Sequence, residues 1–123
     1  MANEVGINVS LNFNKGGAKI SRSESISVDV SGDSYTSAVQ GIPTGGEIFV
    51  EADELGTAGY VFVKNLDGTN YVTVGSHATD NHAIKLKAGE CALFRAAGSV
   101  YAKADTAACN IEYTIIEDLY GYI

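Results

Sequence analysis

The sequence predicts an all-β protein, a two-sheet antiparallel β-sandwich with a jelly-roll-like arrangement of about eight to ten short strands. Apolar and polar residues alternate in many short segments, and turn-forming clusters separate these segments at intervals of roughly 8 to 12 residues. Windows long enough for a helix lack apolar residues at helical spacing. We therefore expect no helix longer than one turn.

The alternation is clearest near the N-terminus, where every second residue from Val5 to Phe13 is apolar and the residues between are Gly, Asn or Ser. A two-residue period is typical of a strand with one solvated face. The pattern returns in two later segments, Ile26, Val28 and Val30, and then Ile48 and Val50. We interpret the serines between Ser21 and Ser37 as the wet faces of strands, and Gly16-Gly17 as a turn.

The segment Tyr60–Val63 is apolar on both faces, which predicts a central strand or a strand at a subunit contact. The Asp-Gly pair in Asn65–Asn70 predicts a hairpin that joins Tyr60–Lys64 to Tyr71–Gly75. Further strands are expected where the alternation resumes, around Ile84 and Leu86, at Cys91–Arg95, at Val100–Lys103 and around Ile111, Tyr113 and Ile115.

A small sandwich cannot hide all of this apolar strand surface. Tyr60–Val63 and Cys91–Phe94 carry large apolar side chains on both faces, and a closed barrel would expose one of those faces. The excess surface predicts a further layer of protein, and self-association is its simplest source.

Length and charge restrict the organisation and the partners. The 123 residues suit one domain, expected over residues 1–118 with a C-terminal extension at residues 119–123. A net charge of −7 argues against nucleic acid as a partner, and no apolar run is long enough for a membrane span. Residues 1–10 lack a secretory signal, so we expect cytosolic folding, with Cys91 and Cys109 as free core thiols.

The sequence predicts no catalytic, metal or cofactor site. His77, Asp80 and His82 lie in a polar segment and are interpreted as turn residues, because a metal site needs further ligands in a fixed geometry. Motifs for a nucleophile or a phosphate-binding loop are absent from the sequence. A carbohydrate-binding module remains an alternative, since seven tyrosines are present, although tryptophan is absent.

Four segments in the second half of the chain carry a resemblance to a known group of proteins. They are residues 59–72 (GYVFVKNLDGTNYV), 86–95 (LKAGECALFR), 101–108 (YAKADTAA) and 111–118 (IEYTIIED). In this order they resemble small virion structural proteins of tailed bacteriophages. The resemblance spans residues 59–118, about half of the chain.

This resemblance implies a non-enzymatic, jelly-roll-like subunit that binds the outside of a capsid as a cement or decoration protein. The implied partners are the major capsid protein and further copies of the chain, as a homotrimer, on a virion assembled in the host cytoplasm. A tail, fibre or head-to-tail adaptor component is the alternative within the same group. The chain departs from the group in its cysteines and in the segment after Asp118.

Two segments are expected to contact a partner. The C-terminal extension is apolar and aromatic, and its predicted contact residues are Leu119, Tyr120, Tyr122 and Ile123. The hairpin tip is the second candidate, through Asn65 and Asp67. For the extension, a frayed terminus is the competing interpretation.

Overall fold

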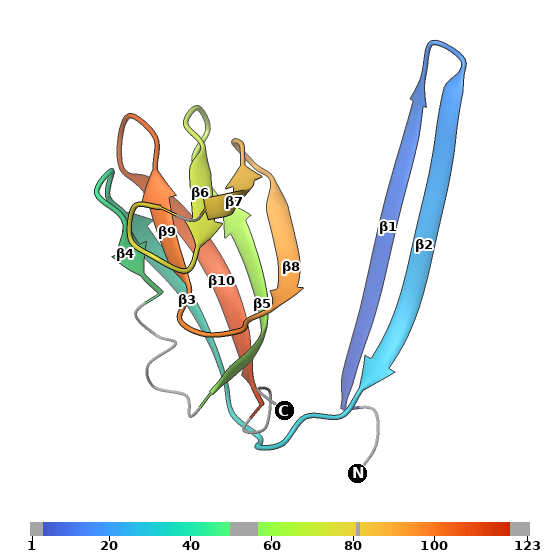
Figure 1. Ribbon diagram of the computed structural model, residues 1–123, viewed down its shortest axis with the longest axis horizontal. Helices are drawn as coiled ribbons and strands as arrows, with labels where there is room; N and C mark the ends of the chain where they lie inside the picture. Colours follow the sequence, from blue (N-terminus) through green and yellow to red (C-terminus); the bar gives the residue numbers. More distant parts are fainter. Residues whose placement is uncertain (1–3, 50–56, 81, 119–123) are drawn as a thin grey trace. The chain divides into compact units, whose positions relative to one another are not determined.

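A computed structural model describes residues 4–49, 57–80 and 82–118 of the protein (Figure 1). Within these residues the chain forms ten β-strands and no helix, as the sequence predicts. The described residues contain no helix that could cross a membrane. The chain divides into two compact units, one that ends at Val30 and one that begins at Ser31.

The first unit is a long β-hairpin, which we call the arm. Strands β1 (Val5–Lys15) and β2 (Ala18–Val28) pair antiparallel along their whole length, from Val5↔Val28 to Lys15↔Ala18. The turn between them is Gly16-Gly17, with φ values of 59° and 88°. A two-residue turn with positive φ at both positions matches the strand twist and favours glycine, so this predicted turn is confirmed.

The second unit is an antiparallel sandwich of two four-stranded sheets (Figure 1). The first sheet has the order β3 (Tyr35–Ile42), β10 (Cys109–Glu117), β5 (Ala58–Asn65) and β8 (Cys91–Arg95). The second has the order β4 (Glu47–Ile48), β9 (Tyr101–Ala104), β6 (Val72–Gly75) and β7 (His82–Leu86). The predicted two-sheet sandwich is confirmed, whereas the jelly-roll arrangement stays a prediction. The sandwich was expected from residue 1, but β1 and β2 form a separate sheet.

The core lies between the two sheets. Its fully buried side chains come from alternate positions of the central strands, mainly Val61, Val63, Val72, Val74, Ala102, Ile111, Tyr113 and Ile115. The ring of Tyr113 stacks on Phe49, with centroids 4.7 Å apart, and its hydroxyl donates a 2.8 Å hydrogen bond to Gln40. Tyr113 therefore buries a large ring and still satisfies its polar end.

The predicted hairpin between Tyr60–Lys64 and Tyr71–Gly75 is wrong. Strand β5 pairs with β10 and β8, whereas β6 pairs with β7 and β9 in the other sheet. The connection therefore crosses from one sheet to the other. Asn65 takes its backbone partners from elsewhere: its N–H donates to Glu90 O, and its carbonyl accepts from the Gly89 N–H. These bonds keep Asn65 beside the segment that leads into β8, in the sheet of β5.

Strand β3 was not anticipated as a distinct strand. Its inward positions include Thr36, Ala38 and Gln40, so its core-facing side shows little apolar alternation. The polar side chain of Gln40 can face inward because its amide donates hydrogen bonds to Glu47 Oε1 and to Ile48 O, at 2.6 and 2.8 Å. Residues 35–42 form a strand because they pair with β10, which lies far away in the sequence.

Two neighbouring isoleucines on β10 test the assignment of the two sheet faces. Ile115 is fully buried between the sheets, whereas Ile116 is half-buried on the opposite face. We expect Ile115→Ala to lower the free energy of unfolding by about 2–5 kcal/mol, because it leaves a cavity in the core. Ile116→Ala is the matched control, with an expected loss below about 1.5 kcal/mol. Equal losses in urea denaturation would contradict the assignment.

Candidate functional site

The first sheet exposes an apolar surface on the face turned away from the core. We call this surface the outer patch and define it by Tyr35, Val39, Tyr60, Phe62, Leu93 and Ile116. Tyr35 and Val39 are 70% and 61% exposed, and Phe62 and Leu93 are 43% and 40% exposed. The expectation that β5 and β8 carry more apolar surface than one sandwich can hide agrees with this exposure.

The strand register brings the outer patch together. Ile116 lies between Tyr35 of β3 and Tyr60 of β5, and Phe62 lies directly beside Leu93 of β8. Four strands therefore contribute neighbouring side chains, although the residues are far apart in sequence. Clustered apolar side chains of this kind are typical of protein interaction surfaces, whereas isolated ones are not.

Polar groups lie between the apolar residues of the outer patch. Glu112 and Lys64 are direct cross-strand neighbours next to Val39, and Ser37 and Thr114 share a 2.7 Å hydrogen bond. Opposite charges and paired hydroxyl groups stabilise neighbouring strands. A partner of the outer patch would therefore meet apolar side chains interspersed with polar groups that are already paired within the sheet.

Arg95 fixes one corner of the outer patch. Its guanidinium lies 4.5 Å from the centre of the Tyr60 ring, donates to the Tyr60 hydroxyl and forms a 3.0 Å ion pair with Asp118. The hydrogen bond to Asp118, followed by that to Tyr60, raises the pKa of Arg95. Asp118 also accepts a hydrogen bond from the Ser31 N–H at 3.1 Å. Tyr60 is thus held in one orientation on the outer patch.

The arm carries a second apolar surface. Because side chains alternate along a strand, one face collects Val5, Ile7, Val9, Leu11 and Phe13 from β1 and Ala18, Ile20, Ile26 and Val28 from β2. Val5 and Ile7 are buried, whereas the large apolar residues from Val9 to the tip are half exposed or more, as is Ile26. Arg22 and Glu24 interrupt the apolar side of β2.

The opposite face of the arm is polar and internally hydrogen-bonded. Ser25 donates to Asn8 at 2.6 Å, and Ser21 donates to Asn12 at 2.7 Å, in both cases across the two strands. This confirms the interpretation of Ser21 and Ser25 as the wet face of a strand, whereas Ser31 and Ser34 of the same predicted set lie between strands. The arm therefore has one face suited to water and one face that is not.

The two predicted contact residues of the hairpin tip differ in burial, since one is completely buried and the other is half-buried. Asn65 is completely buried, and its amide donates to Asn70 O at 2.9 Å and to Leu86 O at 3.1 Å. Its side-chain oxygen accepts from the Asp67 N–H. Asn65 therefore organises the loop and has no exposed surface for a partner, contrary to the expectation of a direct contact.

Asp67 is half-buried, and its carboxylate shapes the loop. Its carboxylate accepts the N–H groups of Thr69 and Asn70, at 2.9 and 2.6 Å. These two backbone bonds, the one from Asn70 first, lower the pKa of Asp67. A partner contact by Asp67 stays a prediction. The predicted contact residues Leu119, Tyr120, Tyr122 and Ile123 lie outside the described residues.

The two histidines take part in protein hydrogen bonds. The ring of His82 bonds to the Thr73 hydroxyl through Nδ1 at 2.8 Å and to the His77 carbonyl through Nε2. Both ring nitrogens that could bind a metal are thus engaged. Within the described parts of the chain, no three His, Cys, Asp or Glu side chains lie close enough to hold a metal ion.

The cysteines lie in different environments and are both free thiols. Cys109 is buried, as expected, and burial raises its pKa, with smaller contributions from the charges of Asp67 and Asp105. The expectation of a core position for Cys91 is wrong. Cys91 is exposed because β8 turns Cys91, Leu93 and Arg95 outward and packs the alternate residues inward.

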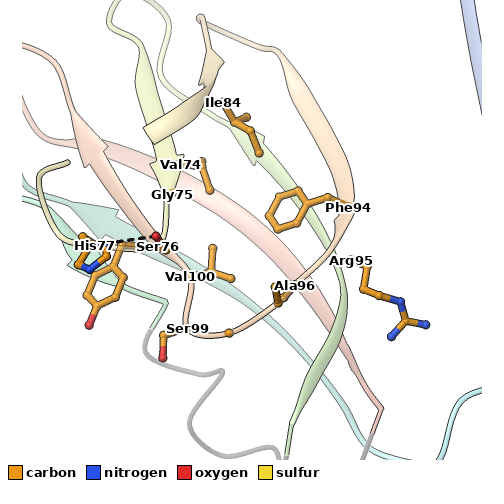
Figure 2. A pocket seen from close by; sticks show the side chains of 13 residues that line it. Val74, Gly75, Ser76, His77, Ile84, Phe94, Arg95, Ala96, Ser99 and Val100 are labelled. Atoms are coloured by element: carbon orange, nitrogen blue, oxygen red, sulfur yellow. Dashed lines mark hydrogen bonds between the residues drawn. The ribbon is translucent and has the colours of Figure 1, made fainter. Parts of the chain in front are cut away.

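An open hollow of about 550 Å³ lies beside β6 and the segment from β8 to β9 (Figure 2). Val74, Ile84, Phe94 and Val100 supply apolar walls, whereas the Arg95 side chain points away. Ser76 and His77, joined by a 3.2 Å hydrogen bond, lie at one end with Ser99. The hollow has few polar side chains. They do not form a nucleophile that is hydrogen-bonded to a base and, through it, to an acid.

Comparisons with protein-family models, curated proteins and solved structures found no match.

Sequence reasoning identified half of the outer patch and missed the rest. It singled out Tyr60–Val63 and Cys91–Phe94, but it did not find Tyr35 and Val39, because β3 has no clear alternation. It also did not separate the arm from the sandwich. A usable signal was present there, since Arg22 and Glu24 stand on the apolar side of β2, where a strand inside a core rarely carries charge.

Replacing Asn65 with Asp tests its structural role. At neutral pH the new carboxylate would lose both amide donations and face two carbonyl oxygens, so we expect a loss of about 3 kcal/mol or more in unfolding free energy. Burial beside carbonyls raises the pKa of such an acid, so part of the loss should be recovered as the pH falls and the acid becomes a donor. Asp67→Asn, at a half-buried position of the same loop, is the control and should have a small effect, because the amide oxygen can still accept the backbone N–H groups. A small, pH-independent loss for Asn65→Asp would contradict this role.

Proposed function

We propose that the protein is a non-enzymatic structural protein of a phage virion that binds the capsid exterior as a cement or decoration protein. The observation that carries this proposal is the outer patch, an exposed cluster of aromatic and aliphatic side chains on a rigid sheet. Water-exposed clusters of this kind favour a partner, because burial of each large side chain contributes roughly 1.5–3 kcal/mol. The resemblance in residues 59–118 makes a virion the natural setting.

The shape of the outer patch suits binding to another protein. It is a sheet face without an enclosed volume, and its side chains are held by strand pairing and by the brace between Arg95, Tyr60 and Asp118. Such a preorganised surface loses little conformational entropy when it binds. A cement protein acts by mass action, since any ligand that binds only the assembled shell stabilises that shell.

Oligomerisation as a homotrimer is part of the proposal. A trimer placed on a local threefold axis of a shell repeats each contact three times, so modest individual affinities combine into high avidity. The partners are then sister subunits and the major capsid protein. A tail, fibre or head-to-tail adaptor would use the same surfaces, and the location of the protein in purified virions distinguishes these alternatives.

Substitution of the outer patch tests the proposal. Phe62→Asp places a charge in its centre, and because Phe62 is 43% exposed we expect the fold to persist. Binding to isolated shells should weaken by more than about tenfold, as for a central aromatic contact. Asn110→Asp is the matched control. It adds the same charge to a polar, exposed position of β10 on the same face of the sheet. Shell binding and oligomer mass are measured by co-sedimentation and native mass spectrometry.

The proposal fails if Phe62→Asp and Asn110→Asp bind shells equally well, or if purified virions lack the protein. Sugar binding on a glycan array, abolished by Phe62→Asp or a Tyr60 variant, would instead favour a carbohydrate-binding module.

Deletion of residues 119–123 tests the predicted contact of the C-terminal extension. We expect the shortened chain to fold with unchanged thermal stability, because the described strands end before this segment. Its occupancy on shells, or its oligomer mass, should fall. Substitution of only Tyr120 and Tyr122 by Ser separates the loss of aromatic contacts from the loss of chain length. Unchanged occupancy and mass would reject the contact.

A further inference from the structure

The apolar face of the arm needs a covering layer. A two-stranded hairpin alone is marginally stable in water, and this one presents half-exposed side chains along one face, including Leu11 at 62% and Phe13 at 50%. The other face already bonds across its strands through Ser and Asn side chains. The missing layer therefore belongs on one defined face.

The apolar face of the arm carries two charged residues in neighbouring side-chain pairs. Successive side-chain pairs along it are Ile7 with Ile26, Val9 with Glu24, Leu11 with Arg22, and Phe13 with Ile20. The two inner pairs each combine an aliphatic residue of β1 with a charged residue of β2. The two outer pairs are entirely apolar. The midpoint of these four pairs lies between Glu24 and Arg22, although Ile7 at one end is buried and Ile26, Val9, Leu11, Phe13 and Ile20 are exposed.

The two charges are opposite and lie on the same strand. Neither Arg22 nor Glu24 has an ion-pair partner among the described residues. Consider a two-fold axis that lies in the plane of the face, perpendicular to the strands, and passes between Glu24 and Arg22. Rotation about this axis brings Glu24 opposite Arg22 of a second copy, and symmetry makes this contact twice. The same rotation brings Val9 opposite Leu11 and Ile26 opposite Ile20.

We infer that the arm is a docking surface for the arm of a second copy of this chain, packed face to face and antiparallel. Two sheets packed in this way lie about 10 Å apart and form a small four-stranded sandwich. A parallel arrangement about an axis along the arm would instead place Glu24 against Val9 and Arg22 against Leu11. That arrangement buries charge against apolar groups without compensation, and is disfavoured.

The contact between arms is a secondary link. Its exposed stretch is about 25 Å long and two strands wide, which is smaller than a standard stable interface of roughly 1,600 Å². It therefore adds to other contacts, and its two-fold symmetry is independent of a threefold contact made through the sandwich. In a shell, two-fold links between threefold units would join them into a continuous net. The inference goes beyond the proposed function and does not require it.

Charge exchange tests the contact in the full-length protein. Arg22→Glu gives a face with two acids, and Glu24→Arg gives a face with two bases, so each variant alone should repel its own copy. We expect the apparent dissociation constant for pairing to rise by about tenfold or more in each variant. An equimolar mixture of the two variants restores both ion pairs and should recover pairing. Sedimentation velocity over a concentration series measures all three samples.

Matched controls use the polar face. Ser23→Glu and Ser23→Arg alter charge between the same two residues but on the opposite side of β2, and both should pair like the unaltered protein. Pairing of the unaltered chain that neither variant weakens would overturn the inference. So would weakened pairing that the mixture does not restore, or a chain that never forms pairs. Shell binding measured in parallel keeps this result separate from the proposed function.

The direction of the arms has its own test. A spin label at residue 14, introduced as Asn14→Cys in a Cys91→Ser background, lies near the tip on the polar face. Antiparallel packing places the two labels roughly 30 Å apart or more, because each lies about four residues from the two-fold axis. Parallel packing would bring the tips together, and a short distance would overturn the antiparallel arrangement.

Discussion

The alternation of side chains along a strand is the constraint on which this structure depends. Each strand has two faces, and a sandwich of two small sheets offers only one interior. Val61, Val63, Ile111, Tyr113 and Ile115 fill that interior, and any large apolar residue one position away must point outward. Phe62, Leu93 and Ile116 are in that position, so the outer patch is a direct consequence of strand geometry.

The segment that follows the arm in the sequence is held against the end of β10. Glu117 accepts a hydrogen bond from the Ser34 N–H, and Asp118 accepts one from Ser31 and pairs with Arg95. Gly32 has a φ of 99°, and a Cβ there would lie 2.3 Å from the Glu117 carboxylate. The end of β10, the start of the arm connection and one corner of the outer patch are thus held by the same two acids.

The arm and the outer patch are physically different kinds of surface. The outer patch is one face of a sheet whose other face is buried in a core, so its geometry exists without a partner. The arm has no core of its own, and its apolar face depends on another layer for its stability. One rigid face and one dependent face are the two kinds of surface that the proposed shell binding and the proposed pairing of arms would use.

The sequence by itself determined the all-β class, most strand positions, the Gly16-Gly17 turn and the apolar excess on β5 and β8, because these follow from the local period of side chains. The tertiary structure decided which strands pair and which side chains are exposed, because the local period of side chains does not specify non-local contacts. Strand β3 exists through pairing with β10. Strands β5 and β6 pair with strands of different sheets, and Cys91 is exposed because it lies on the outward face of β8. Likewise, β1 and the sandwich strands show the same alternation. Only non-local contacts determine that the sandwich strands border the core between the two sheets.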